Sequence, residues 1–363
     1  MSRTRNRGAI NLGLFLVTLG LGWFIFSNLN IGITPIVFAY ILIIAGVAIV
    51  LSVIVTWRRA SLPVGGIAGA IVAGLILALF LTHGLTLIQM FGGGTGVWAF
   101  RSQTAKSYSG SITSGKIYLE VDNINGPVRV STWNRNEYSI DLTIRAGGPS
   151  QTGANANLAN FKPSLDATQQ EGQQRLVLRY DIGQTSRSWY SVDVTATLPA
   201  AANTDLDLVS NNGLIQVTNV NGTTISLTTS NARLNLDHVY ATTSITAGTS
   251  NAQVEGILQA PNTTVSTSNA KITLTIPSTI SGNYTLSTSN GAIALRVSPS
   301  TQVGYGVDLS TSNANINVTL SNITYSVNQR TQVTGQTTGF TSLPTRVILK
   351  AITSNAAISV AAG

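Results

Sequence analysis

The string TSNAKITLTI, residues 267–276, decides the fold of the second half of this chain. Its asparagine is followed by a small residue, and apolar side chains then stand at alternate positions: Ile272, Leu274 and Ile276. Apolar residues with a period of two are typical of a strand that buries one face. Asparagine tolerates a left-handed backbone and a small follower avoids crowding, so the asparagine predicts a bend before the strand.

This string recurs with a Gly or Ala after the asparagine in every copy. The aligned asparagines are Asn212, Asn231, Asn251, Asn269, Asn290, Asn313 and Asn355. Their intervals are 19, 20, 18, 21, 23 and 42 residues, and we interpret the last as two periods with a degenerate copy between. A period near twenty built of strands and bends predicts a β-solenoid, in which only stacking completes the core of each coil. The asparagines would then form a structural turn ladder, with amides bonded from coil to coil. DNINGPVRV predicts an eighth, diverged copy with Asn125 at its bend.

The rest of the chain divides by composition. We expect solenoid repeats over 201–363 and a less regular β region over 115–200, with an exposed excursion at 147–174 that lacks periodicity. Residues 92–114, which begin with a glycine run, are interpreted as a linker or stalk. Residues 1–91 form a separate, strongly apolar part.

Three apolar stretches, 8–29, 35–57 and 64–91, lack Asp, Glu, Lys and Arg. Each is long enough to cross a hydrocarbon core, which takes about 20 helical residues. A cleavable signal peptide is the rival interpretation of the first stretch, but two further stretches follow it. The predicted fold class is therefore an all-β ectodomain, solenoid-like with coils of about twenty residues, preceded by three transmembrane α-helices.

The basic residues near these stretches predict an orientation. Arg3, Arg5 and Arg7 precede the first stretch, and Arg58 and Arg59 lie between the second and third. Basic loops stay cytoplasmic, so three crossings predict a multi-pass protein of the cell membrane with a cytoplasmic N-terminus and an extracellular C-terminal domain.

The third stretch carries small residues at four-residue intervals, Gly65, Gly69 and Ala73. Such a face lets helix backbones approach closely. It would serve either packing against the other two spans or formation of a homo-oligomer through the third span.

Charge and cysteine content exclude several classes of protein. The net charge is +8, from 21 basic and 13 acidic residues, but the five arginines named above flank apolar stretches. The remaining 16 basic residues exceed the acidic ones by only 3, and they form no stripe with interleaved aromatic residues. We therefore expect no nucleic-acid partner. The absence of cysteine excludes disulfides and thiolate metal sites.

The acidic residues were weighed as catalytic groups. A glycan-cleaving site or a Ca²⁺ site needs carboxylates close together. Asp205 and Asp207 would share a strand face, although the solvent face of a strand explains them as well. Asp237 and His238 are adjacent, without a distinctive nucleophile, and Glu255 and Asp308 stand alone. Because no triad or metal-ligand spacing appears, we expect neither catalysis nor a cofactor or metal.

Five Asn-x-Ser/Thr sequons are candidate glycosylation sites. Their asparagines are Asn221, Asn262, Asn283, Asn317 and Asn322.

From about residue 115 to 363, the NxNG, VDVTATLP and repeated TSN-Gly/Ala-x-Ile-x-Leu strings resemble the bacterial and archaeal β-strand repeat family labelled "putative adhesins". The resemblance implies a solenoid-like fold at the cell envelope without established catalytic residues. The first two apolar stretches are weakly similar to the membrane hairpin of bacterial envelope-stress regulators.

Three functions follow as hypotheses. The first is a membrane-anchored surface adhesion or interaction protein, without catalysis, that contacts the lipid bilayer and an envelope glycan, S-layer or cell-surface protein. The second is an envelope-stress sensor or regulatory membrane protein. The third is a glycan-active β-helix enzyme that uses Asp205 and Asp207.

Overall fold

The computed structural model describes residues 12–21, 24, 71–75, 77–78 and 100–363. The chain divides into two compact units, Met1–Ala99 and Phe100–Gly363. The described residues of the first unit are helical. Gly74 lies against Thr18 there, so the two described segments are in contact.

The predicted transmembrane fold and membrane location are contradicted. No helix in the described residues is long and apolar enough to cross a membrane. Parts of the stretches 8–29 and 64–91 are described as short helical segments, and the stretch 35–57 lies outside the described residues. The arginines that suggested an orientation, and most of the small residues that suggested a homo-oligomer, also lie outside them. The sequence argument was wrong because it took apolar composition alone as evidence for three long helices.

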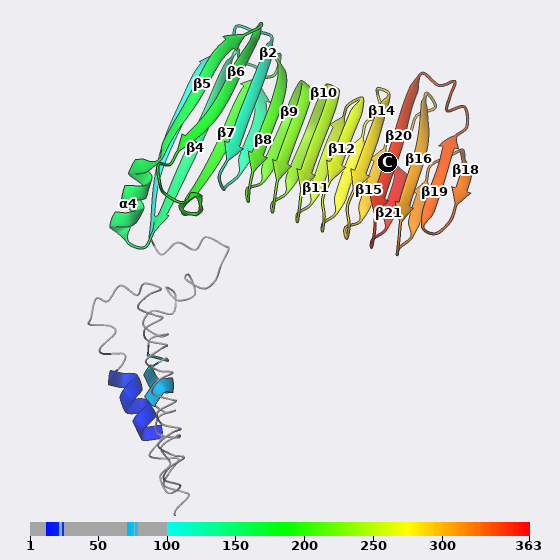
Figure 1. The fold of residues 1–363 in the computed structure, drawn as a ribbon. Helices are drawn as coiled ribbons and strands as arrows, with labels where there is room; N and C mark the ends of the chain where they lie inside the picture. The colour runs from blue at the N-terminus through cyan, green and yellow to red at the C-terminus, as the bar shows by residue number, and fades with distance from the viewer. Residues whose placement is uncertain (1–11, 22–23, 25–70, 76, 79–99) are drawn as a thin grey trace, which may run out of the picture. The chain divides into compact units, whose positions relative to one another are not determined.

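The second unit is built almost entirely of strands (Figure 1). Its first part contains β1 (Phe100–Ser111), β2 (Lys116–Asn123), β3 (Val128–Trp133), β4 (Glu137–Gly148), α4 (Gln151–Asn160), β5 (Lys162–Gln170), β6 (Gln173–Asp181), η1 (Arg187–Trp189), β7 (Tyr190–Pro199) and β8 (Asn203–Ser210). The repeats form β9 (Ile215–Thr229), β10 (Leu234–Thr249), β11 (Val254–Gln259), β12 (Asn262–Ser266), β13 (Ile272–Ile276), β14 (Gly282–Ser287), β15 (Ile293–Val297), β16 (Val303–Thr311), β17 (Ile316–Thr319), β18 (Ile323–Asn328), β19 (Gln332–Thr337), β20 (Thr345–Thr353) and β21 (Ile358–Ala362).

Strand pairing runs along two faces that are joined by β9 and β10, each of which takes part in both. The first face has the order β5-β6-β2-β8-β9-β10-β12-β14-β20-β16-β19-β18. The second has the order β1-β4-β7-β3-β9-β10-β11-β13-β15-β21-β17. The middle pairings are parallel, and antiparallel pairings flank them at both ends of the first face and at the β1 end of the second, which ends at β17 in a parallel pairing with β21. The fold is thus not the uniform solenoid that the repeat predicted.

Alternate side chains of these strands fill one continuous core between the two faces. In β13, Ile272, Leu274 and Ile276 are completely buried, whereas the intervening threonines are not. Parallel register places Ile272 between Val254 of the preceding coil and Ile293 of the following one. The burial of each such side chain contributes about 1.5–3 kcal/mol to the free energy of folding. Each of these side chains is buried only because the neighbouring coils cover it.

The order of coils in space differs from their order in the sequence. β20 pairs with both β14 and β16, and β21 pairs with both β15 and β17. Figure 1 shows β20, in red, between β14 and β16. The last coil of the chain therefore lies inside the stack. The 42-residue interval holds no degenerate coil: after β17 it contains the antiparallel pair β18–β19, and the chain then returns to fill the gap.

The first part of the unit is more regular than the sequence predicted. β2 and β3 form the first parallel coil, and the predicted excursion at 147–174 contains α4, β5 and the start of β6. The Ser150 hydroxyl caps α4 by accepting a hydrogen bond from the Gly153 N–H. β1 lies mostly within the predicted linker and pairs with β4 along its whole length. These elements escaped prediction because β1 and β5 are polar and show little alternation.

Because β20 lies between two other coils, we expect an alanine substitution in β20 to destabilise the protein more than one in β18. Leu349→Ala in β20 should lower the free energy of unfolding by about 2–5 kcal/mol, because Leu349 is completely buried between two coils. Ile323→Ala in β18, at the end of the stack, should lower the free energy of unfolding by less than half as much as Leu349→Ala. Urea denaturation of both variants measures the difference, and equal costs would contradict the inserted position.

Candidate functional site

The seven predicted ladder asparagines lie in a single row along one edge of the stack, and Asn125 begins it. Each Nδ2 donates to the Oδ1 of the asparagine on the neighbouring coil at 2.7–2.8 Å. The row runs Asn125, Asn212, Asn231, Asn251, Asn269, Asn290, Asn355 and Asn313. Asn355 thus connects Asn290 to Asn313, as the inserted coil requires. The side chains are exposed, but their amides are largely occupied with one another.

A second row of hydroxyls was missed by the sequence interpretation. Two residues before each ladder asparagine stands a buried Ser or Thr whose hydroxyl bonds the backbone. Thr267 Oγ1, for example, donates to the carbonyl oxygens of Ser250 at 3.4 Å and Ala252 at 3.2 Å, both on the preceding coil. The row comprises Ser210, Thr229, Thr249, Thr267, Thr288, Thr311 and Thr353. The signal was present, since this position carries a hydroxyl in every copy of the repeat.

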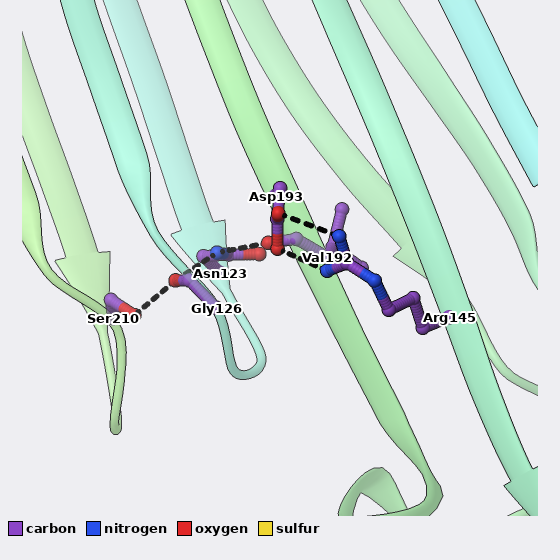
Figure 2. Close-up of polar contacts among 6 residues, drawn as sticks. All are labelled: Asn123, Gly126, Arg145, Val192, Asp193 and Ser210. Atoms are coloured by element: carbon purple, nitrogen blue, oxygen red, sulfur yellow. Dashed lines mark hydrogen bonds and ion pairs between the residues drawn. The ribbon is translucent and has the colours of Figure 1, made fainter. Parts of the chain in front are cut away.

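A polar cluster joins the first coil to the antiparallel strands beside it (Figure 2). The buried Asn123 donates through Nδ2 to the carbonyl oxygens of Gly126 at 2.9 Å and Val192 at 2.8 Å. Arg145 and Asp193 form a two-bonded ion pair at 2.6 and 3.0 Å. The hydrogen bonds that the Arg145 guanidinium donates to the Asp193 carboxylate raise the pKa of Arg145. Because every polar group drawn in this cluster bonds another part of the protein, we assign it a structural role.

Asp205 and Asp207 lie on the outer face of β8, as the alternation predicted, but they have different surroundings. Asp205 Oδ1 accepts hydrogen bonds from the backbone N–H groups of Thr223 at 2.7 Å and Thr224 at 2.9 Å. This carboxylate therefore fixes the bend within β9. Asp207 lies beside Glu120 of β2 in the strand register. The part of the chain that the structure describes contains no group of three or more His, Cys, Asp or Glu that could hold a metal ion.

The other candidates from the sequence are dispersed. Asp237 Oδ1 lies 2.7 Å from His238 Nδ1, and both side chains are about half exposed. His238 has a φ of 54° at an irregularity of β10, so the pair marks a bend in a strand. Glu255 accepts a hydrogen bond from Gln253. The five sequon asparagines are all exposed, and Asn262 and Asn283 are neighbours in register on β12 and β14.

An open hollow of about 700 Å³ lies on the first face, over β16, β18, β19 and β20. Its floor is Gly306, which lies between Ile348 of β20 and Gln336 of β19 in the strand register. The Phe340 ring lies over this glycine, 3.5 Å from where a Cβ would stand. Ile348 is 42% exposed, so an apolar surface remains open at the wall. No motif in the sequence indicates this hollow.

Two opposite charges lie at and beside the hollow: Asp308 lines it, and Lys350 is on the neighbouring strand. Asp308 and Lys350 are register neighbours on β16 and β20 and are exposed. Within the described part of the chain, neither residue belongs to any of the ion pairs. The two charges therefore lie beside one another without a direct ion pair, and both side chains are exposed to solvent.

A row of hydroxyls leads along the same face to these two charges. Strand register places Ser226, Thr246, Thr264 and Thr285 side by side, and Lys350 and Asp308 continue the row. Neighbouring strands are about 4.8 Å apart, so the row presents a polar group at that repeat. The surface can offer many weak hydrogen bonds along a line that ends in a shaped hollow.

Comparison with known proteins gives structural neighbours but no sequence match. No family model matches the chain, and no curated protein matches it. A "putative cell adhesion protein" from Clostridium sporogenes is 10% identical, with a TM-score of 0.38 over 72% of this chain and 100% of its own. A "putative adhesin" from Bacteroides fragilis is 11% identical, with a TM-score of 0.35 over 72% and 99%. A "putative lipid binding protein" from Parabacteroides distasonis is 10% identical, with a TM-score of 0.36 over 72% and 98%.

The loss of stability on replacing a ladder asparagine should depend on whether the residue lies inside the ladder or at its end. Asn251→Ala removes an amide that both donates to and accepts from its neighbours, so the free energy of unfolding should fall by about 1–2 kcal/mol. Asn313→Ala, at the end of the ladder, removes one of these bonds and should cost about half as much. Thermal unfolding followed by circular dichroism measures both variants. If the ladder does not contribute to stability, both variants will unfold like the wild-type protein.

Alanine substitutions of the two aspartates of β8 should differ in their effect on stability. Asp205→Ala should destabilise the protein by about 1–3 kcal/mol, because two backbone N–H groups lose their acceptor. Asp207→Ala, its matched control on the same strand face, should change stability by less than about 0.5 kcal/mol. Chemical denaturation measures both. An equal loss of stability at the two positions would show that Asp205 has no special structural role.

Proposed function

We propose that this protein is a non-catalytic interaction protein of the adhesion type, and that its ligand is an extended polysaccharide. The ligand would lie along the hydroxyl row of the first face and place one sugar unit in the hollow beside Phe340. The observation that carries the proposal is the continuity of this row with the hollow.

The chemistry of the hollow suits a sugar ring. Such a ring has apolar C–H faces and a rim of hydroxyl groups. Phe340 and Ile348 offer apolar contact, and the Asp308 carboxylate accepts hydrogen bonds from hydroxyls. Gln336 and Thr324 lie in the same strand register and can both donate and accept. Lys350, close by, suits an acidic group on a neighbouring unit.

The openness of the site favours a polymer over a small free ligand. Sites for small molecules usually enclose most of the ligand surface. Here one unit would be held in a shallow hollow, and further units would add weak hydrogen bonds along the row. Ser226, Thr246 and Thr264 lie on successive coils, so the number of contacts grows with the length of the polymer.

The non-catalytic part of the proposal draws support from the acidic residues. Glycoside hydrolysis uses two carboxyl groups that flank the scissile bond. Asp205 is engaged by the backbone of β9, and Asp308 is the acidic residue among those lining the hollow. Binding without turnover is therefore the function that this geometry supports best.

Affinity electrophoresis in gels that contain dextran, alginate or chitosan tests the proposal. We expect one of these polymers to retard the protein, and Phe340→Ala to weaken the retardation at least about tenfold, equivalent to about 1.4 kcal/mol. Asp308→Asn should weaken it too. The matched control is Thr228→Ala, which alters an exposed hydroxyl on the same face, outside the row and the hollow. Retardation by none of the polymers, or equal retardation of Phe340→Ala and the wild type, would contradict the proposal.

A further inference from the structure

The hydroxyl row of the first face has one member on each coil. From β9 to β16 its members are Ser226, Thr246, Thr264, Thr285, Lys350 and Asp308. Within the described residues, the four hydroxyls form no hydrogen bond with the rest of the protein. Each pairing joins directly neighbouring strands, which lie about 4.8 Å apart, so the row extends over about 24 Å. A straight ligand can therefore meet a polar group on each of six strands.

The coils along this row keep a constant spacing and register. Sheets usually twist, which would turn successive hydroxyls away from a straight line, but side-chain ladders hold many-stranded sheets flat. The seven hydrogen bonds of the asparagine ladder all measure 2.7–2.8 Å, so neighbouring coils approach one another equally closely. The pairings from β10 to β16 contain no register shift, and Figure 1 shows β9, β10, β12 and β14 side by side. The row is therefore close to straight.

We propose that the ligand is a cellulose-type polysaccharide, an extended ribbon of β-linked sugars that places successive sugars on successive coils. The inference rests on the proposed function and adds the linkage of the polymer to it. Each sugar of such a ribbon advances the chain by nearly the distance between neighbouring β-strands. An α-linked chain of the same sugar winds into a helix instead and leaves the line of the row. The ribbon therefore keeps step with the coils over several units.

A second row beside the hydroxyls suits the other edge of such a ribbon. It consists of Ser244, Asn262 and Asn283, two residues before the hydroxyl positions of β10, β12 and β14. Ile348, at the wall of the hollow, follows Asn283 in the same register. The two rows are about 6.6 Å apart, which is close to the width of a sugar ring. Alternate sugars of a β-linked ribbon are turned over, so its hydroxyls lie along both edges. One edge can bond the hydroxyl row while the other bonds Ser244 and the two amides.

Isothermal titration calorimetry of the full chain with cellobiose, cellotetraose and cellohexaose tests the proposal. Maltose, maltotetraose and maltohexaose are the matched ligands, since they contain the same uncharged sugar in the same number and differ only in linkage. We expect the dissociation constant in the cellobiose series to fall at least about twofold with each added glucose, because each forms hydrogen bonds on a further coil. Maltohexaose should bind about as tightly as maltose, because its later sugars leave the row.

A substitution within the row gives a second measurement. Thr264→Val removes one hydroxyl and keeps a β-branched side chain that suits a strand. It should raise the dissociation constant of cellohexaose at least about twofold and leave that of cellobiose, which is held at the hollow, unchanged. Phe340→Ala should weaken the binding of both sugars. The matched control is Thr228→Val, an exposed position of β9 outside both rows, which should change neither. Circular dichroism verifies that the variants fold.

The outcomes separate the linkage of the ligand from the proposed function. Equal affinity for cellohexaose and maltohexaose, no gain of affinity with length, or an unchanged affinity of Thr264→Val for cellohexaose would overturn the cellulose-type ligand, while binding at the hollow would stand. The absence of binding in both series would also overturn it. The proposed function falls as well only if the polysaccharide gels show no retardation.

Discussion

Burial of each coil by its neighbours is the constraint on which the rest of this structure depends. A single strand such as β13 has three aliphatic side chains on one side, and they leave water only when Val254 and Ile293 lie on either side of Ile272. A shift of one residue would turn these side chains to the outside, so the register has to be held. The buried threonine row and the asparagine ladder hold it at each bend, where the chain passes from one face to the other.

The same constraint explains the distribution of polar residues. Core positions alternate with outward positions, and on β9, β10, β12 and β14 one row of outward positions carries hydroxyls: Ser226, Thr246, Thr264 and Thr285. Asp205 shows the exception, a carboxylate engaged by the N–H groups of a bend. Asp308 and Lys350 show the opposite case, in which two exposed, oppositely charged side chains lie in register on neighbouring strands without a direct ion pair.

Much of the repeat region could be predicted from the sequence, because the period of two and the recurrent asparagine reflect local chemistry. The position of Asn355 in the ladder could not, since intervals along the chain do not reveal which coils become neighbours in space. The hollow beside Phe340 was equally hidden, because it arises where Gly306, Gln336 and Ile348 meet from three strands. The helical spans were wrongly predicted because apolar composition gives no direct evidence of helix length. β1 and α4 were missed because their polar sequences show no clear period.

The inserted last coil has a consequence for how this protein is made. During synthesis from the N-terminus, β16 and β17 emerge before β20 and β21, so the coil they belong to has no partner on its inner side. The edges of β14 and β15 must stay unpaired until residues 345–363 leave the ribosome. Contacts of such long sequence separation form slowly, and bare strand edges invite aggregation in the meantime. Residues 345–363 therefore complete the stack, and nascent chains that stop before these residues would expose unpaired strands to which chaperones bind.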